Sequence, residues 1–347
     1  MKIRARLHGR SQRFATLLLI LLSIGLLFGM FEAGFRITRY VVRGPNSLPT
    51  VEHHELGWVH NTKRTAVSRS NSCGELVLSQ PAPTSYIVKY PKDHGGMRVL
   101  FLGDSTTHAH EVSTEAAFYD VVEALGRGRY SVWAAGVGGY GSLQEYLLLR
   151  KIYEAIRPDI VIWQLDSNDI ADNVYELDRA SISSSMKRRP YFDPHTGQIV
   201  YRNPAVFPFN ISHGARFLLS QLVALDLLYN FGMVKSVENW LGPIPERQHA
   251  LRRQGLEVLD HVVGEVRRQY PQTRLIGLAT VLDPADDRAY EEVFRGRDAE
   301  YWPNFTARVR LTSGEPTDCV PWDRHWNHEG NRVAGQLIGK SLDVITK

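Results

Sequence analysis

The chain has 347 residues, of which 43% are hydrophobic and 22% are charged, a composition typical of globular domains. Its formal net charge is +4, and five basic residues with no acidic residue among them lie in the first 13 positions: Lys2, Arg4, Arg6, Arg10 and Arg13. Because the charge of these five residues is larger than the net charge of the whole chain, the rest of the chain has no excess of basic residues. We therefore expect no nucleic-acid-binding domain and no nucleic-acid partner.

The first predicted element is a membrane anchor. No residue from Phe14 to Phe31 is charged, and apolar residues continue past Glu32. Since about 20 apolar residues cross a bilayer, we expect a transmembrane helix over 14–35, preceded by a cytoplasmic basic tail over 1–13. The positive-inside rule then predicts a cell-membrane protein whose remaining chain is periplasmic or extracellular. The competing interpretation is a cleaved signal peptide, although residues 31–36 offer no good cleavage site.

Residues 36–96 have no long periodic pattern and are predicted to form a membrane-proximal extension packed on a catalytic domain over 97–347. One short packed segment stands out at 54–59. The extension contains Cys73, and the only other cysteine of the chain is Cys319. Outside the cytoplasm these two can form a disulfide, but sequence separation does not exclude two unpaired thiols.

The strongest single motif is a strand that ends in Gly103-Asp104-Ser105. The run from Val99 to Leu102 is apolar and continuous, as in a strand buried on both faces. We expect Gly103 to permit a sharp turn through its backbone freedom. Ser105 would then lie at the carboxyl end of the strand, where open α/β sheets bind ligands. The alternative is that Asp104 and Ser105 only cap the next helix.

Strands and helices alternate after this motif. Further predicted strands cover 130–135, 159–165, 274–279 and 307–311. Predicted helices cover 116–125, 142–157, 247–269 and the residues from 329 onward. Such alternation predicts a parallel sheet with right-handed crossovers, so polar groups collect at one edge. Residues 170–245 interrupt the pattern and are predicted to be an insertion, or lid, that sets substrate specificity.

The second half of a site is predicted just before the last helix, at Asp323-Arg324-His325. A histidine near an aspartate can act as a general base that the carboxylate orients. For the isolated motif, a polar loop in which Asn327 caps the final helix is the better interpretation. A serine at a strand end changes that balance.

The chain resembles the SGNH (GDSL-type) hydrolase and acyltransferase superfamily, of the membrane-anchored bacterial type. The resemblance rests on four blocks in order: 103–105, 135–141, 166–169 and 323–327. It implies a three-layer flavodoxin-like α/β fold with a central parallel sheet of about five strands. It also implies catalytic roles for Ser105 as nucleophile, His325 as base and Asp323 as its orienting carboxylate. The implied oxyanion hole consists of the Ser105 N–H, the Gly139 N–H and the Asn168 amide.

Three departures from the family pattern affect this interpretation. Asp166 stands where the third block usually has glycine, and Ala134 stands where the second block often has asparagine. Asp323 precedes His325 by two residues, where many members have three. The shorter spacing is similar to that of membrane-associated acetyltransferases of bacterial exopolysaccharides, which slightly favours acyl transfer.

Three functions follow from the resemblance. The first is an outward-facing serine esterase that acts on O-acetyl or other acyl groups of a glycan or lipid. The second is an O-acyltransferase that modifies an extracellular polysaccharide with the same triad, and the third is a catalytically silent glycan-binding or assembly protein. We expect no cofactor and no metal, because His108 and His110 near His325 and His328 are not a specific metal signal. The oligomeric state stays open.

Overall fold

A computed structural model describes residues 16–27, 29–30, 50–63, 67–70, 76–79, 81–92, 95–178, 187–193, 196–202, 245–281, 283–320 and 323–346. Its centre is a parallel sheet of five strands: β5 (Met97–Gly103), β6 (Tyr130–Gly136), β7 (Ile160–Leu165), β10 (Arg274–Ala279) and β11 (Glu300–Trp302). The strand order is β11-β10-β7-β5-β6. The chain therefore changes direction across the sheet at β5, and this kind of switch point is where open sheets bind ligands. The predicted α/β class with five parallel strands is confirmed.

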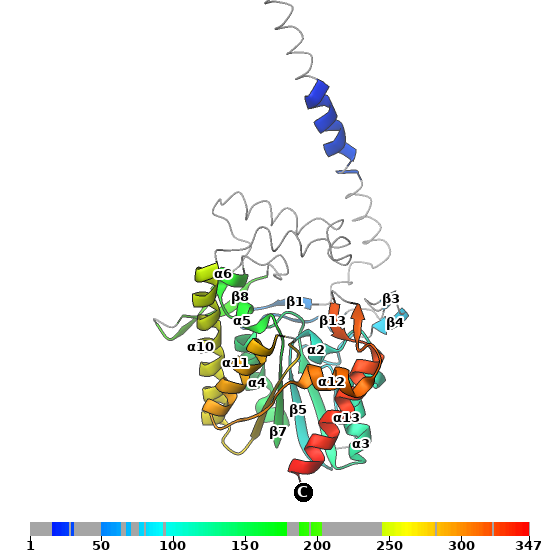
Figure 1. Ribbon diagram of the computed structural model, residues 1–347, viewed down its shortest axis with the longest axis vertical. Helices are drawn as coiled ribbons and strands as arrows, with labels where there is room; N and C mark the ends of the chain where they lie inside the picture. Colours follow the sequence, from blue (N-terminus) through cyan, green and yellow to red (C-terminus); the bar gives the residue numbers. More distant parts are fainter. Residues whose placement is uncertain are drawn as a thin grey trace, which may run out of the picture.

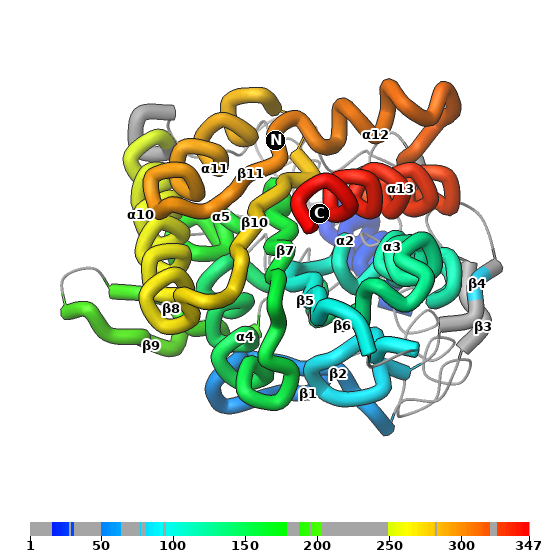
Figure 2. The backbone as a smooth tube through the Cα atoms, turned by 90° about the horizontal axis from the view of Figure 1, so that it is seen from below, coloured from blue at the N-terminus to red at the C-terminus, as the bar shows by residue number. Residues whose placement is uncertain are grey.

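Both faces of the sheet are buried, which explains why β5 is a continuous apolar run. Val99 and Phe101 pack into one hydrophobic cluster, and Leu100 and Leu102 pack into the other. The helices over the first face are α3 (Phe118–Gly126), α12 (Phe305–Ser313) and α13 (His328–Ile345). Those over the second face are α4 (Ser142–Ile156), α10 (Pro245–Gln269) and α11 (Pro284–Gly296). Figure 2 shows the resulting three layers end-on.

One predicted strand is wrong. Residues 307–311 belong to helix α12, and the fifth strand is the short β11. The alternation of Ala307, Val309 and Leu311 with arginines imitates the period of a strand. In the structure Val309 is fully buried whereas Leu311 is 85% exposed. Burial therefore follows helical spacing, from Phe305 to Val309.

Smaller elements surround the sheet. Four antiparallel hairpins are β1 (Thr50–His53) with β2 (Gly57–His60), β3 (Val67–Ser70) with β4 (Leu76–Ser79), β8 (Arg189–Asp193) with β9 (Gln198–Arg202), and β12 (Asp318–Val320) with β13 (Asp323–Trp326). The short helices are α2 (Ser105–His108), η1 (Thr114–Ala116), α5 (Asp169–Asp172) and α6 (Tyr175–Asp178). Figure 1 shows α2, α5 and β13 near the same end of the sheet, the carboxyl end of its strands.

The predicted anchor and extension are described only in part. Residues 16–27 are helical and their side chains are exposed. Across the described ranges, no helix combines the length and the apolarity needed to cross a bilayer. Residues 1–13, 31–49 and 203–244 lie outside the described residues, so the predicted domain boundaries stay predictions. Cys319 on β12 is disulfide-bonded, and Cys73 lies outside the described residues.

Candidate active site

Ser105 begins helix α2, directly after β5. Asp104 is the N-cap, and its carboxylate accepts a hydrogen bond from the Thr106 N–H at 3.2 Å. Gly103 is required for space: a Cβ there would lie 2.4 Å from Thr107 Oγ1 and 2.8 Å from the Gln164 carbonyl oxygen. Its φ is not positive. The expectation that Gly103 serves through backbone freedom is therefore wrong, and close packing of α2 against β7 takes its place.

The structure brings Ser105 and His325 together across 220 residues of sequence. Ser105 Oγ lies 2.8 Å from His325 Nε2, which is hydrogen-bonding distance. A neutral imidazole with its proton on Nδ1 can accept the serine proton in this arrangement. Asp323 lies two residues earlier on the same strand, β13, but its side chain is outside the described residues. Its role as the orienting carboxylate stays a prediction.

Asp104 is a second acceptor for the same hydroxyl. Ser105 Oγ lies 3.2 Å from Asp104 Oδ2, and a hydroxyl has only one proton to donate. Burial, reinforced by the charge of Asp166, raises the pKa of Asp104 to about 7. A neutral carboxyl accepts hydrogen bonds less strongly than a carboxylate. The raised pKa of Asp104 thus favours the bond from Ser105 to His325.

Further carboxyl groups lie behind Asp104. Burial raises the pKa of both Glu145 and Asp169 well above the usual range, and nearby carboxylates add to the effect. Trp163 Nε1 donates to Glu145 at 2.6 Å, and the Asp166 N–H donates to Asp169 at 2.8 Å. Each of these two carboxyl groups thus has a hydrogen-bond donor that fixes its position.

The second block passes beside Ser105. A Cβ built at Gly138 would lie 3.7 Å from the Cβ of Ser105, so this backbone approaches the serine closely. Gly139 has a φ of +78°, in the left-handed region that glycine adopts without strain. The Gly138–Gly139 peptide is thus near the predicted reaction centre. The donor role of the Gly139 N–H stays a prediction.

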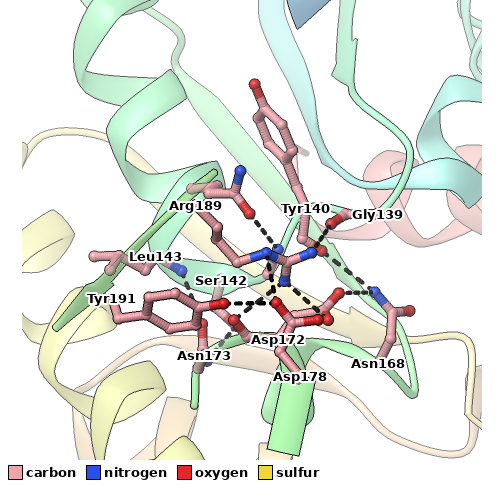
Figure 3. Close-up of polar contacts among 12 residues, drawn as sticks. Gly139, Tyr140, Ser142, Leu143, Asn168, Asp172, Asn173, Asp178, Arg189 and Tyr191 are labelled. Carbon is pink, nitrogen blue, oxygen red and sulfur yellow. Dashed lines mark hydrogen bonds and ion pairs between the residues drawn. The ribbon is translucent and has the colours of Figure 1, made fainter. Parts of the chain in front are cut away.

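The Asn168 amide lies at the same edge but is already engaged. Its Nδ2 donates to Asp172 Oδ2 at 2.8 Å and to the Tyr140 carbonyl oxygen at 3.3 Å (Figure 3). An amide nitrogen has two protons, so stabilising an oxyanion requires release of one partner. The hydrogen bond to the Tyr140 carbonyl oxygen is the longer of the two and is therefore the easier one to break. Active-site hydrogen bonds are often loose before substrate binds.

Asp166, the unusual residue of the third block, has a clear structural partner. Thr106 Oγ1 donates to Asp166 Oδ2 at 2.8 Å, and the Tyr290 hydroxyl donates to the Asp166 carbonyl oxygen at 2.7 Å. The carboxylate thus ties the end of β7 to α2, one residue after Ser105. Asp166 therefore fixes the position of the serine helix.

A row of histidine rings leads to His325. Ring centroids lie 4.7 Å apart for His60 and His108, 5.2 Å for His108 and His110, and 5.8 Å for His110 and His325. His110 Nδ1 also lies 2.8 Å from the buried Glu111 carboxylate. Burial lowers the pKa of His60 to about 4, so this ring is neutral.

Within the described part of the chain, no three His, Cys, Asp or Glu groups are arranged to hold a metal ion.

Two residues that the sequence did not single out contact the second block. Trp58 Nε1 donates to the Gly138 carbonyl oxygen at 3.2 Å. Arg189 donates to the Gly139 carbonyl oxygen at 2.8 Å. The available signals were weak, a tryptophan in a short packed segment and an arginine pair before a proline. Neither reveals a contact to residues 50 or 80 positions away.

No family model matches this chain, and no curated protein is similar to it. Solved structures similar to it include TesA, with 13% identity, 72% of this chain and 99% of the other covered, and a TM-score of 0.41. Esterase EstA from Pseudoalteromonas sp. has 11% identity, coverages of 72% and 98%, and a TM-score of 0.40. The acetyl xylan esterase AlAXEase has 14% identity, coverages of 71% and 100%, and a TM-score of 0.39. At such low identities and TM-scores, the likeness carries no functional conclusion.

Proposed function

We propose that this chain is a membrane-anchored serine esterase that faces outward and cleaves ester-linked acyl groups from a glycan or a lipid. The observation that carries the proposal is the 2.8 Å contact between Ser105 Oγ and His325 Nε2 at the carboxyl end of a parallel sheet. A serine hydroxyl is a weak nucleophile until a base removes its proton. A histidine at hydrogen-bonding distance is such a base.

The proposed reaction has two steps. Ser105 Oγ bonds to the ester carbonyl carbon while its proton passes to His325, and the alcohol then leaves with that proton. Water next bonds to the acyl carbon, His325 takes a water proton, and the acid is released as Ser105 recovers its proton. Asp323 would hold the imidazole tautomer and stabilise its cation. No cofactor or metal enters this scheme.

The negative oxygen formed in each step needs donors that are already in position. The Ser105 N–H, the Gly139 N–H and the Asn168 amide would supply them. The close approach of Gly138 to Ser105 supports this assignment, as does the position of Asn168 at the start of α5. The three donors would then converge on the carbonyl oxygen of the bound ester.

Membrane anchoring and orientation are part of the same proposal. The helix over 16–27 exposes a nearly continuous set of leucine and isoleucine side chains, which is costly in water. The uncharged run and its basic flank support insertion with the amino terminus in the cytoplasm. The catalytic domain would then meet acylated glycans or lipids outside the membrane. A carboxyl-terminal reporter active only in the cytoplasm would overturn this orientation.

The proposed activity is tested with the full chain in detergent. We expect the wild-type protein to hydrolyse p-nitrophenyl acetate and to carry a trapped acetyl group on the peptide that contains Ser105. Both the hydrolysis and the acetylated peptide should be lost in Ser105→Ala. Oligosaccharide acceptors are then added. Acylated sugar, with little hydrolysis in its absence, would instead identify an O-acyltransferase with the same triad. No turnover under either condition would favour a silent glycan-binding protein.

A further inference from the structure

The Gly138–Gly139 peptide is held from both ends by side chains that lie outside the four blocks of the family. Trp58 binds the carbonyl that precedes the proposed oxyanion N–H, and Arg189 binds the carbonyl that follows it. Trp58 comes from β2, ahead of the sheet, and Arg189 from β8, in the predicted insertion. Side chains from two remote segments thus control one short backbone stretch beside Ser105.

Trp58 determines which way the Gly139 N–H points. In a trans peptide the carbonyl and the following N–H point in opposite directions, and none of the described peptide bonds is cis. With Trp58 Nε1 on the Gly138 carbonyl oxygen at 3.2 Å, the Gly139 N–H must point away from Trp58. The indole is only 1% exposed and packs edge-on against Tyr140 at 5.4 Å. The Tyr140 hydroxyl also donates to the Trp58 carbonyl oxygen, so a second hydrogen bond holds Trp58 against the second block.

Arg189 holds the other side of Gly139 and is itself buried, at 1% exposure. Its guanidinium donates to the Gly139 carbonyl oxygen at 2.8 Å and to the Asp172 carbonyl oxygen at 3.1 Å. It also lies 2.8 Å from the Asp172 carboxylate and 3.3 Å from that of Asp178. Figure 3 shows this guanidinium between the glycine loop and the two carboxylates. The planar fork of arginine is what lets one side chain serve several partners.

The same guanidinium reaches the second proposed donor. Asp172 Oδ1 bonds Arg189, and Asp172 Oδ2 accepts from the Asn168 amide at 2.8 Å. Tyr191, two residues after Arg189, donates to Asp178 at 2.6 Å and completes the cluster. Arg189 also lies over the Trp58 ring, with Cζ at 5.2 Å from its centroid. Gly139, Asn168 and Trp58 are thereby linked through one buried charge.

We propose that Trp58 and Arg189 are positioning residues that orient the two non-serine oxyanion donors, the Gly139 N–H and the Asn168 amide. This inference rests on the proposed esterase function. Neither residue touches the reacting atoms, so their effect must appear in the transition state and not in substrate binding. A purely structural role predicts lower stability with no selective loss of kcat.

The test begins with Trp58→Phe, which removes the indole donor but keeps an aromatic ring. The Gly139 N–H remains, yet it is free to turn. Deleting an oxyanion donor costs about 10²–10³ in rate, so we expect a smaller loss of about tenfold in kcat with KM nearly unchanged. The control is Trp163→Phe, since Trp163 is fully buried and donates to Glu145 instead of to the glycine loop.

A second readout uses ethylboronic acid, which forms a tetrahedral adduct on an active-site serine. One adduct oxygen occupies the oxyanion position, so its affinity reports on the donors as a transition-state analogue does. We expect Trp58→Phe to weaken this inhibitor by the same factor as kcat, and Trp163→Phe to leave it unchanged. Equal losses in the two variants, or an unchanged boronate affinity in Trp58→Phe, would refute the positioning role.

Arg189→Lys extends the test to both donors. Lysine keeps the positive charge that Asp172 and Asp178 require, which protects folding, but it cannot bind Gly139 and Asp172 with the same geometry. We expect a loss of kcat and of boronate affinity larger than in Trp58→Phe, about a hundredfold by analogy with loss of one donor. An Arg189→Lys enzyme with wild-type kcat would contradict the role of Arg189. Wild-type protein with neither Ser105-dependent hydrolysis nor boronate adduct would remove the esterase proposal, and the positioning proposal with it.

Discussion

The proposed nucleophile, Ser105, and the proposed oxyanion donors lie at the same edge of the sheet, yet different parts of the chain hold them. Ser105 directly follows the core strand β5, and His325 lies on β13, just before the core helix α13. Gly139 and Asn168 also follow core strands, but Trp58 and Arg189 connect them to β2 and β8. The comparison teaches that sequence motifs can contain all the proposed reacting groups, while the orientation of the oxyanion donors depends on segments outside those motifs.

The largest expected effect is on the nucleophile half. Ser105→Ala removes the hydroxyl that contacts His325 Nε2, so we expect at least about a 10⁴-fold loss of kcat. The loss follows because no other group forms the acyl-enzyme. The control is Ser313→Ala on α12, whose hydroxyl bonds Glu329 away from the site. Both variants are compared by p-nitrophenyl acetate hydrolysis and by thermal unfolding, and turnover in Ser105→Ala would disprove the assignment.

The next effect concerns the oxyanion half. Asn168→Ala deletes a proposed donor, and we expect a loss of about 10²–10³ in kcat with little change in KM. Asn173→Ala is the matched control, because Asn173 is a buried asparagine that bonds the Leu143 N–H and the Gly255 carbonyl. That control should lower the unfolding temperature without a comparable loss of kcat. If the two variants lose activity equally, Asn168 is only a structural residue.

A smaller effect is expected from Gly139→Ala. Alanine at a φ of +78° costs about 1–2 kcal/mol of backbone strain, although its Cβ would meet Trp58 at an ordinary 3.7 Å. Relief of that strain would rotate the peptide between residues 138 and 139 and turn its N–H away from the proposed oxyanion position. We therefore expect about a tenfold loss of kcat. Gly197→Ala separates strain from catalysis, since Gly197 has a φ of +67° and open space around it. A kinetic loss shared by both variants would show that strain alone explains it.

The smallest effect is on the pH dependence of stability. Burial raises the pKa of Asp104 from 3.8 to about 7, so the folded protein binds this proton more tightly than the unfolded chain. Stability should therefore fall as pH rises from about 4 to about 7. Asp104→Asn should make the loss of stability with rising pH smaller. Part of the loss should remain, because burial also raises the pKa of Asp172, to about 6. Thermal unfolding across this pH range measures the slope.

The control for that measurement is Asp283→Asn. Asp283 is also an N-cap, and its carboxylate accepts from the Ala285 N–H at 2.8 Å, but it is exposed. Asparagine keeps the oxygen that caps the helix in both variants, so each substitution removes only the carboxyl group, and only Asp104→Asn should alter the slope. An unchanged slope in Asp104→Asn would mean that the carboxyl titrates as an ordinary aspartate.

Much of the fold followed from local pattern. The apolar run of β5 predicted a strand buried on both faces, and Val99 and Leu100 indeed reach opposite hydrophobic clusters. β11 escaped prediction because three residues are too few to establish a period. The arginines of α12 concealed a helix by alternating with apolar residues. Local pattern thus succeeded where an element was long enough to repeat.

For the site, motif order predicted which residues would meet, and Ser105 and His325 do meet. It did not reveal what supports them. Arg189 follows an exposed arginine, and nothing local distinguishes the buried one from the exposed one. The burial of Asp104 and its raised pKa likewise depend on residues far along the chain, Asp166 among them. Support of this kind is decided by tertiary packing, which short sequence windows do not contain.

The β8–β9 hairpin has a consequence for protein engineering. Surface hairpins beside active sites are attractive places to exchange loops between relatives, because such segments usually alter selectivity without disturbing the scaffold. Here the first residue of β8 is Arg189, the buried partner of Asp172 and of the Gly139 carbonyl. A transplanted loop that lacks this arginine would leave a buried carboxylate uncompensated. Successful grafts at this position must therefore retain Arg189 together with its partner Tyr191, and selectivity is best varied beyond them.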